Sequence, residues 1–454
     1  MSIPESEGQG TDQPDRQQRS VRVPILTRVE GEGGLLVRID GHTIRDVELS
    51  IYEPPRLFEA LLRGRSFTEV ADITARICGI CPIAYQMTAV QAIENALGVE
   101  ISPAIRSLRR LLYCGEWIES HVLHIHLLHA PDFFDCESGI ELAQRFPNEV
   151  KRGLQMKKFG NRLLEVLGGR AIHPINVAVG GFYRLPRREE LISLVPDFQS
   201  CLQAALETVK WVADFPFPDF HVKYNAVSMI HDQEYPITHG DICCSDGTRM
   251  DAANYEKFFA EEQVPHSTAL HSLRMPGRET YLVGPLARVS LNVDRLSPAA
   301  RRIAGEIGWD GMSTNPYCGI VARALEVVHA FEEALTYLRQ YDPPVEPRAK
   351  FEVREGEGAS STEAPRGLIY HRYQIDASGR VELAKIVPPT SQNQAQIESD
   401  IRQLLPSILD HDDRSIALHC EKLIRSYDPC ISCSTHFLKL RIEGRPAAQR
   451  QEGI

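Results

Sequence analysis

Two Cys-x-x-Cys pairs lie near opposite ends of the chain. The first is Cys78 and Cys81 in "ARICGICPIAYQ", and the second is Cys430 and Cys433 in "YDPCISCSTHF". This spacing lets two thiolates converge on one metal ion, so two pairs can supply four sulfur ligands. Zinc ribbons and knuckles join such pairs over about 15 to 20 residues, whereas most of the chain separates these two. A site built from both pairs would therefore lie inside a large fold.

The residue types alone leave the metal open, because thiolates suit nickel, iron and zinc. Cys78 and Cys81 precede an apolar segment with helical spacing, where the unpaired amides of a first turn favour thiolate over thiol. Arg76 adds positive charge beside them. The alternative to a four-thiolate metal site is two unrelated buried cysteine pairs.

Composition restricts the class of protein. The 454 residues include 50 basic and 61 acidic side chains, giving a net charge of −11 without a polybasic run, so nucleic acid is not an expected partner. No apolar run approaches the roughly 18 to 20 residues of a membrane span, and the first twenty residues lack the apolar centre of a signal peptide. Eleven cysteines are too sparse and irregular for a disulfide framework. We expect a cytoplasmic protein with no membrane span.

Apolar spacing predicts the elements that position the cysteines. Intervals of three and four residues predict a helix from Ile83 to Leu97 and further long helices within 105–130, 188–215 and 315–341. Alternation predicts strands within 21–40, 44–52, 221–230 and 279–284, and a hairpin over 367–387 that turns at Ser378-Gly379. Residues 355–366 have the composition of a loop. We expect an α+β, mainly α fold: a central bundle of long helices with small peripheral β-sheets.

The predicted domain organisation is simple, because no repeat or long linker divides the chain. Residues 1–20 read as a disordered lead and residues 21–436 as a single intertwined domain. Residues 437–454 form a C-terminal extension.

Together these motifs resemble those of the catalytic large subunit of nickel-iron hydrogenases. "RICGIC" and "DPCISCSTH" carry the resemblance, and "RVEGEGG", "RLFEALLRGRS", "SHVLHIHLLHAPDF", "GGRAIHPINVAVGGF" and "TEAPRGLIYH" extend it in matching order. The resemblance implies a hydrogenase large-subunit-like fold around a centre of nickel and of iron bearing carbon monoxide and cyanide. The cysteine motifs are most similar to the cytoplasmic, NADP-linked branch, which includes the sulfhydrogenases.

The resemblance assigns roles to the residues around such a centre. Cys78 and Cys430 would be terminal nickel ligands, and Cys81 and Cys433 would bridge nickel and iron. Glu30, in "RVEGEGG", matches a glutamate that relays protons from Cys430. Without the other motifs, Glu30 would read as a solvated carboxylate in a turn.

Arg366, in "APRG", matches an arginine whose guanidinium lies over the metals. Asp132 and Asp428 match carboxylates that hold this arginine, and Pro365 shares its loop. The alternatives are a surface ion pair for Arg366 and a turn former for Asp428 before Pro429.

Two further sets of residues match ligands of the family. Thr390 or Ser391, in "VPPTSQN", would provide a hydroxyl group to an iron-bound cyanide. Glu59 and His436 match ligands of a magnesium ion, for which a carboxylate is an expected ligand and an imidazole a less usual one.

Histidines are densest at His121, His124, His126 and His129. Metal binding by them is conceivable, but core or proton-network histidines with hydrogen-bonded partners are favoured. Tyr85 stands where many family members have a histidine, and a tyrosine does not titrate near neutral pH.

The implied activity is reversible heterolytic cleavage of H2. Electrons would pass to a small iron-sulfur subunit and then through FAD-containing, NAD(P)-binding diaphorase subunits, with sulfur or polysulfide reduction as a further activity of the branch. This chain has no Walker loop or G-x-G-x-x-G fingerprint, so nucleotide binding would belong to partners. The alternatives are a non-catalytic scaffold like the hydrogenase-like subunit of respiratory complex I, and a structural four-cysteine zinc protein.

The end of the chain departs from the pattern. In most family members a protease cuts after the residue matching His436 once nickel is inserted, which implies a maturation protease and nickel-insertion proteins as further partners. This chain continues to Ile454. Either the sequence is that of the precursor or processing does not occur, and an attached tail would affect ligation by His436.

Overall fold

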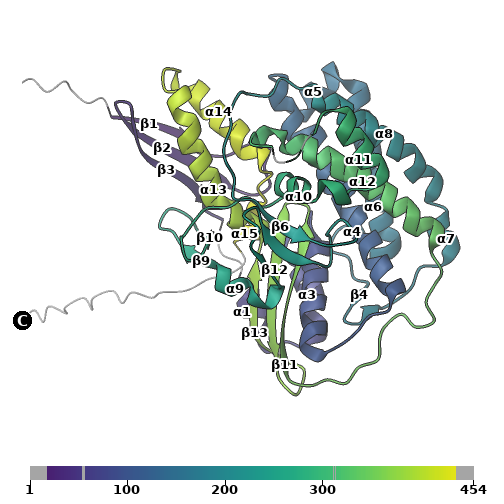
Figure 1. Ribbon diagram of the computed structural model, residues 1–454. Coiled ribbons are helices and arrows are strands. Elements are labelled where there is room, and N and C mark those ends of the chain that lie inside the picture. The colour runs from purple at the N-terminus through teal and green to yellow at the C-terminus, as the bar shows by residue number, and fades with distance from the viewer. Residues whose placement is uncertain (1–17, 54–56, 310, 312, 436–454) are drawn as a thin grey trace, which may run out of the picture.

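Long helices and small antiparallel sheets surround α15 (Ile431–Ser434), which carries the end of the second cysteine pair (Figure 1). The structure is a computed structural model and describes residues 18–53, 57–309, 311 and 313–435. The mainly helical α+β fold confirms the expected fold class. None of the described helices is long and apolar enough to cross a membrane.

The helical bundle forms one side of the molecule (Figure 1). Its long helices are α4 (Pro103–Leu123), α6 (Pro147–Gly168), α8 (Val195–Ala213) and α12 (Gly319–Gln340). α4 packs against α6 and α12, and α8 packs against α12. The apolar periodicity predicted α4, α8 and α12, because each buries one face against its neighbours, but it did not predict α6.

Further helices are shorter than these four. They are α1 (Phe58–Leu62), α2 (Val70–Thr74), α5 (Gly139–Arg145), α7 (Arg188–Ile192), α9 (Tyr255–Phe258), α10 (Pro285–Asn292), α11 (Pro298–Glu306), α13 (Pro389–Leu404), α14 (Asp413–Ser426) and α15 (Ile431–Ser434). Single-turn 3-10 segments are η1 (Phe67–Glu69), η2 (Ala75–Ile77), η4 (Ala130–Phe133), η5 (Ala252–Asn254), η6 (Val293–Arg295), η7 (Pro316–Cys318) and η8 (Leu405–Ser407).

The sheets are all antiparallel and small. One three-stranded sheet consists of β1 (Gln18–Val23), β2 (Gly33–Asp40) and β3 (Thr43–Ile51). A second consists of β6 (Val227–Ile230), β7 (Asp241–Cys244) and β8 (Arg249–Met250). A third is β11 (Gly356–Ala364), β12 (Gly367–Ile375), β13 (Val381–Val387). The two-stranded sheets are β4 (Val177–Ala178), β5 (Gly181–Phe182) and β9 (Phe259–Gln263), β10 (Leu270–Arg274). Residues 279–284, predicted as a strand, make only isolated bridges.

The β11–β13 sheet packs against α3 (Pro82–Leu97), the helix that follows the first cysteine pair. The hairpin turns at Ser378-Gly379 as predicted, with Gly379 at φ 81°. The prediction that residues 355–366 form a loop was wrong, because most of them form β11. A Cβ atom at Gly358 would lie 2.2 Å from the Ala92 carbonyl oxygen, so small residues are needed where this strand approaches α3.

α3 is buried on nearly every side between this sheet and the bundle. Pro82 begins the helix and Gly98, at φ 67°, ends it, as expected for a proline first residue and a glycine cap. The amides of Ile83 and Ala84 donate to the Glu116 carboxylate over 2.6 and 3.1 Å. Burial holds the pKa of Glu116 well above its ordinary value, although these two donors oppose the shift. Glu116 therefore anchors the start of α3, where the first cysteine pair ends.

The four histidines of the cluster are buried at the end of α4, which contains His121, and in the π-helix His124–His129 that continues it. His121 Nε2 lies 2.9 Å from Glu326, and His124 Nε2 lies 2.8 Å from the Arg425 carbonyl oxygen. Among the residues that the structure describes, these histidines form no group able to hold a metal ion together. The interpretation as core and network histidines therefore holds for His121 and His124.

Stability is expected to fall as the pH drops below about 6.5, partly because of His126. Burial lowers the pKa of His126 from 6.5 to about 4, so between these values the unfolded chain binds a proton that the folded chain does not. This costs up to about 3 kcal/mol of unfolding free energy by pH 4. Denaturant unfolding of the wild type and of His126→Asn across pH 4 to 8 measures the contribution.

The asparagine amide can still donate to the Val122 carbonyl, as His126 Nδ1 does over 3.1 Å. The smaller side chain should lower stability at every pH, so the dependence on pH is the informative readout. The variant should lose less stability on acidification than the wild type, and equal dependences would contradict the assignment.

Candidate metal centre

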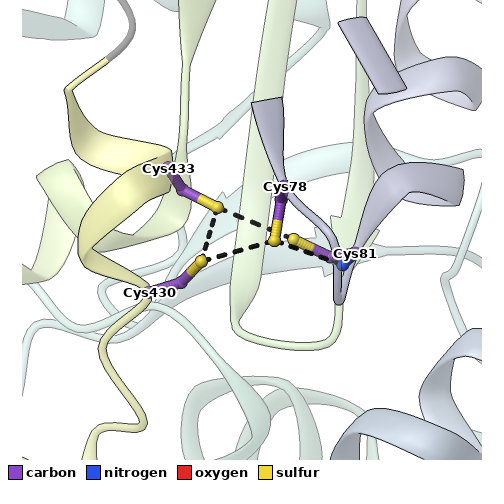
Figure 2. Close-up of side chains that lie close together, drawn as sticks. All are labelled: Cys78, Cys81, Cys430 and Cys433. Atoms are coloured by element: carbon purple, nitrogen blue, oxygen red, sulfur yellow. Dashed lines mark hydrogen bonds between the residues drawn. The ribbon is translucent and has the colours of Figure 1, made fainter. Parts of the chain in front are cut away.

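The four cysteines of the two pairs meet in the interior (Figure 2). Their sulfur atoms lie within 4.8 Å of one another. Cys78 Sγ is 3.5 Å from Cys430 Sγ, Cys81 Sγ is 3.7 Å from Cys433 Sγ, and Cys430 Sγ is 2.7 Å from Cys433 Sγ. All four side chains are buried and none forms a disulfide. The predicted convergence of the two distant pairs is therefore confirmed.

Local backbone structure directs the second pair toward the first. Asp428 has a left-handed φ of 55°, and Cys430 follows as the residue before α15. The Cys430 amide donates to Thr390 Oγ1 over 3.0 Å. The Ile431 amide donates to the Glu30 carbonyl over 2.9 Å, and Glu30 and Cys430 form an isolated parallel bridge. The N-terminal loop and the start of α13 thus hold the C-terminal cysteines in place.

The surroundings of Cys78 favour a thiolate, whereas the pKa of Cys81 is raised well above its ordinary value, because the lowering by Cys430 is outweighed by Cys433, Cys78 and burial together. Hydrogen bonds from the other three thiols, Cys430 first, lower the pKa of Cys78 well below its ordinary value. The amides of Ile80 and Cys81 also point at Cys78 Sγ, each over 3.3 Å. Burial instead raises the pKa of Cys430. Four buried soft donors at this spacing suit a metal that takes thiolate ligands.

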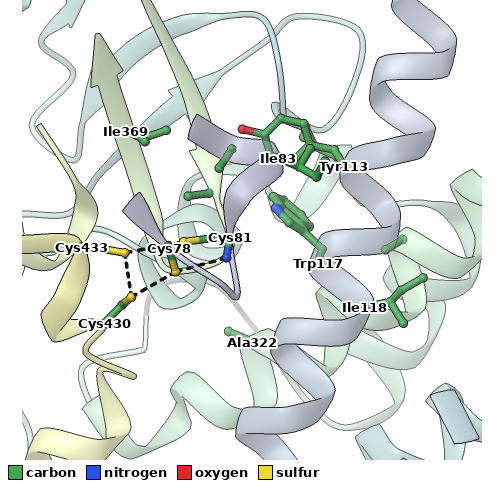
Figure 3. Packing of buried hydrophobic residues seen from close by; sticks show 14 of the residues in the cluster. Cys78, Cys81, Ile83, Tyr113, Trp117, Ile118, Ala322, Ile369, Cys430 and Cys433 are labelled. Atoms are coloured by element: carbon green, nitrogen blue, oxygen red, sulfur yellow. Dashed lines mark hydrogen bonds between the residues drawn. The ribbon is translucent and has the colours of Figure 1, made fainter. Parts of the chain in front are cut away.

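Apolar and aromatic side chains from α3, α4 and β12 pack around this cluster (Figure 3). Ile83, Tyr113, Trp117 and Ile369 are all fully buried there. Tyr85, which replaces the expected histidine, is fully buried as well, and burial together with the Cys433 thiol raises its pKa well above the ordinary value. Tyr85 therefore lies beside the cysteines without being able to take up a proton near neutral pH.

Glu30 connects the cluster to the half-exposed edge of the site. Its Oε2 accepts a hydrogen bond from Cys430 Sγ over 3.1 Å and another from the Ser432 amide over 3.0 Å. Its side chain is neither fully buried nor fully exposed. The simple interpretation of a solvated turn carboxylate does not describe it, because its oxygen contacts a buried thiol.

Arg366 is fixed by the chain segment that precedes the second cysteine pair. Its Nε donates to the Asp428 carbonyl over 2.8 Å, and its Nη2 lies 3.1 Å from the Asp428 carboxylate. Burial opposes the charge, but Asp428 and the neighbouring Cys430 outweigh it and raise the pKa of Arg366. Its third nitrogen, Nη1, is buried and has no hydrogen-bond partner among the described residues. A surface ion pair, the alternative for Arg366, is excluded because the side chain is 3% exposed.

Asp132 does not contact Arg366, contrary to the expectation. Both of its oxygens lie 2.8 Å from nitrogens of Arg425, and Arg28 binds it as well. Burial alone would raise the pKa of Asp132, but Arg425 reverses the shift. Arg425 and Arg28 thus occupy both oxygens of the Asp132 carboxylate. Neither Arg28 nor Arg425 was identified as a site residue from the sequence, although Arg28 begins the motif "RVEGEGG"; Arg425 lies outside the motifs.

The other expected site residues contact different partners. Thr390 contacts Cys430 as described, whereas Ser391 Oγ donates to the Pro388 carbonyl over 3.0 Å. Glu59 Oε1 accepts from the Ile386 amide over 2.7 Å. The carbonyl of Pro365 accepts from Arg288 over 3.0 Å. His436 lies outside the described residues.

Comparison with known proteins agrees with this geometry. The family model "Nickel-dependent hydrogenase" matches residues 56–152 and 277–436, which include all four cysteines. The chain belongs to this family. The predicted relationship to the large subunits of nickel-iron hydrogenases is therefore confirmed.

Curated relatives of this nickel-dependent hydrogenase chain cover almost its whole length. The chain is 34% identical over 437 residues to sulfhydrogenase 1 subunit alpha of Pyrococcus furiosus, covering 92% of this chain and 98% of that one. It is 27% identical over 484 residues to NAD-reducing hydrogenase HoxS subunit beta of Cupriavidus necator, covering 92% and 95%. The similarity to the sulfhydrogenase branch is thus borne out.

Solved hydrogenases share the fold. An NAD+-reducing [NiFe]-hydrogenase in its H2-reduced state superposes with a TM-score of 0.82 at 24% identity, covering 93% of this chain and 100% of that one. The reduced Ni-Fe-Se hydrogenase from D. vulgaris Hildenborough gives 0.74 at 20% identity, covering 92% and 100%.

Proposed function

We propose that this chain is the catalytic subunit of a nickel-iron hydrogenase that cleaves H2 heterolytically and reversibly. The observation that carries the proposal is the contact between Glu30 and Cys430 at the edge of a buried four-thiol cluster. A structural zinc site needs four thiolates but no carboxylate on one of them. A proton-producing reaction needs a base at this position.

The donor set fits the centre of this family. Cys78, Cys81, Cys430 and Cys433 would hold a centre of nickel and of iron carrying carbon monoxide and cyanide. When bound, the centre would supply the redox chemistry of H2 cleavage. The unpartnered Nη1 of Arg366 would face this centre, and the Thr390 hydroxyl group would stand ready for a cyanide ligand.

The chain itself would move the proton. The Cys430 thiolate would accept it at Sγ and pass it to Glu30 Oε2, 3.1 Å away. The partly exposed Glu30 would then release it toward the surface. Asp428 would orient Arg366, whose fixed positive charge favours the thiolate form of the neighbouring cysteines.

Electrons would leave through partners. We infer a small iron-sulfur subunit and diaphorase subunits with FAD and NAD(P), because one relative is named as an NAD-reducing hydrogenase. Sulfur or polysulfide reduction is proposed as a further activity from the sulfhydrogenase relatives. Glu59 and His436 would bind magnesium. A maturation protease and nickel-insertion proteins would assemble the centre.

An infrared spectrum of the protein, purified with its natural partners from its own host, tests this function. We expect stretches of metal-bound carbon monoxide and cyanide that shift on exposure to H2, together with nickel in elemental analysis. Intact and matured protein without these bands would contradict the proposal. Zinc without nickel that is lost in Cys430→Ser would then identify a structural four-cysteine site, and an empty cluster would identify a scaffold.

A further inference from the structure

A second group of metal-ligating side chains lies outside the four-cysteine cluster. His266, His271 and Glu398 each offer one ligand atom, and these atoms lie within 4.8 Å of one another. His266 lies between β9 and β10, His271 in β10, and Glu398 in α13. The β9–β10 hairpin and the distant helix α13 thus bring two imidazoles and a carboxylate together.

His271 is the member that an ordinary ion pair does not explain. Its side chain is 4% exposed, and its buried Nε2 has no hydrogen-bond partner among the described residues. A buried polar nitrogen without a partner costs free energy, so such an atom in a folded protein usually marks a missing water or ion. Its ring meets the His266 ring edge-on, with 5.6 Å between the centroids.

The other two side chains are already arranged as metal ligands are. His266 Nε2 lies 2.8 Å from Glu398 Oε1, and the Leu49 amide donates to the same oxygen over 2.8 Å. The hydrogen bond from the Leu49 amide holds the Glu398 carboxylate in place, as hydrogen bonds to metal-binding side chains do in metal sites. Among described residues nothing bonds Glu398 Oε2, and both side chains are partly exposed, at 20% and 16%, which leaves a route for an ion.

We propose that His266, His271 and Glu398 bind a divalent transition metal, with zinc as the expected ion. Two imidazoles and one carboxylate, completed by water, form an ordinary zinc ligand set. Ligand atoms about 2.0 to 2.2 Å from zinc lie closer together than 4.8 Å, so binding would draw the three side chains inward by small rotations. The ion would replace the hydrogen bond between His266 Nε2 and Glu398 Oε1.

Such an ion would join elements that lead to the cysteine cluster. β10 and β3 both pack on α13, and α13 begins at Pro389, directly before Thr390, whose hydroxyl group holds the Cys430 amide. The zinc would therefore stabilise the helix that positions the second cysteine pair. The proposal does not depend on hydrogenase activity, because zinc can be measured in an inactive preparation.

The test is zinc retention by the natural complex. The complex is treated with a chelator, incubated with Zn2+ alone, freed of unbound ion and analysed for zinc per large subunit. His271→Gln and Glu398→Gln should each retain one zinc fewer than the wild type. The glutamine at 398 keeps an oxygen for the Leu49 amide, so this variant guards against misfolding.

His411→Gln is the matched control. His411 and His419 form another histidine pair with centroids 5.4 Å apart, but no carboxylate joins them in a metal-ligating group among the residues described. Zinc should also raise the melting temperature of the wild type and of His411→Gln, but not that of Glu398→Gln. Equal zinc retention by wild type and Glu398→Gln, or equal loss in His411→Gln, would overturn the proposal.

Discussion

Cys430→Ser is expected to lower H2 turnover by at least about 1,000-fold, which corresponds to about 4 kcal/mol in the activation barrier. Cys430 Sγ contacts three other reactive groups: Cys78, Cys433 and Glu30. Serine removes a soft ligand and leaves a hydroxyl group that is far harder to deprotonate than a thiol. It therefore impairs both metal binding and the first proton transfer. H2 oxidation with an artificial electron acceptor, together with nickel content, measures the effect.

Cys201→Ser is the matched control for this substitution. Cys201 is also a buried cysteine, 1% exposed, but it lies on α8 in the bundle, away from the cluster. It should lose some stability, because a buried hydroxyl group needs a partner, while folded protein keeps its nickel and its turnover. Wild-type turnover by Cys430→Ser would contradict the assignment of Cys430 as a metal ligand.

Glu30→Gln is expected to lower H2 turnover by about 100- to 10,000-fold, the usual range for removal of a general acid or base. The amide has nearly the shape of the carboxylate and can still accept from the Ser432 amide, so the contacts between the N-terminal loop and α15 should persist. What it cannot do is take the proton from Cys430 Sγ, 3.1 Å away. The loss should therefore fall on turnover while the metal centre stays assembled.

Infrared bands and nickel content separate this effect from a failure of assembly. Both should match the wild type in Glu30→Gln, whereas the solvent isotope effect and the pH dependence of turnover should change. Glu32→Gln tests specificity, because Glu32 is an exposed carboxylate of the same segment. It should behave as the wild type. Full turnover in Glu30→Gln with an unaltered pH profile would show that the proton leaves by another route.

Local patterns predicted the elements well. The helix after Cys81 follows from apolar spacing, a proline at its start and a glycine at its end, and the hairpin at Ser378-Gly379 follows from alternation and turn residues. Both depend on neighbours in the chain. The error at β11 has the opposite origin: Gly356 and Gly358 resemble a loop in sequence, but they are small because α3 passes against them.

The sequence by itself determined which residues could do chemistry: the two cysteine pairs and, through the family motifs, Glu30 and Arg366. Only the tertiary structure decided how they are connected. In the fold, Asp132 binds Arg425 and Arg28, whereas Arg366 binds Asp428. The fold also brings Glu398 to two histidines far away in the chain. The physical reason is that ligand type and short spacing are local properties, whereas which buried charges meet depends on how distant segments pack.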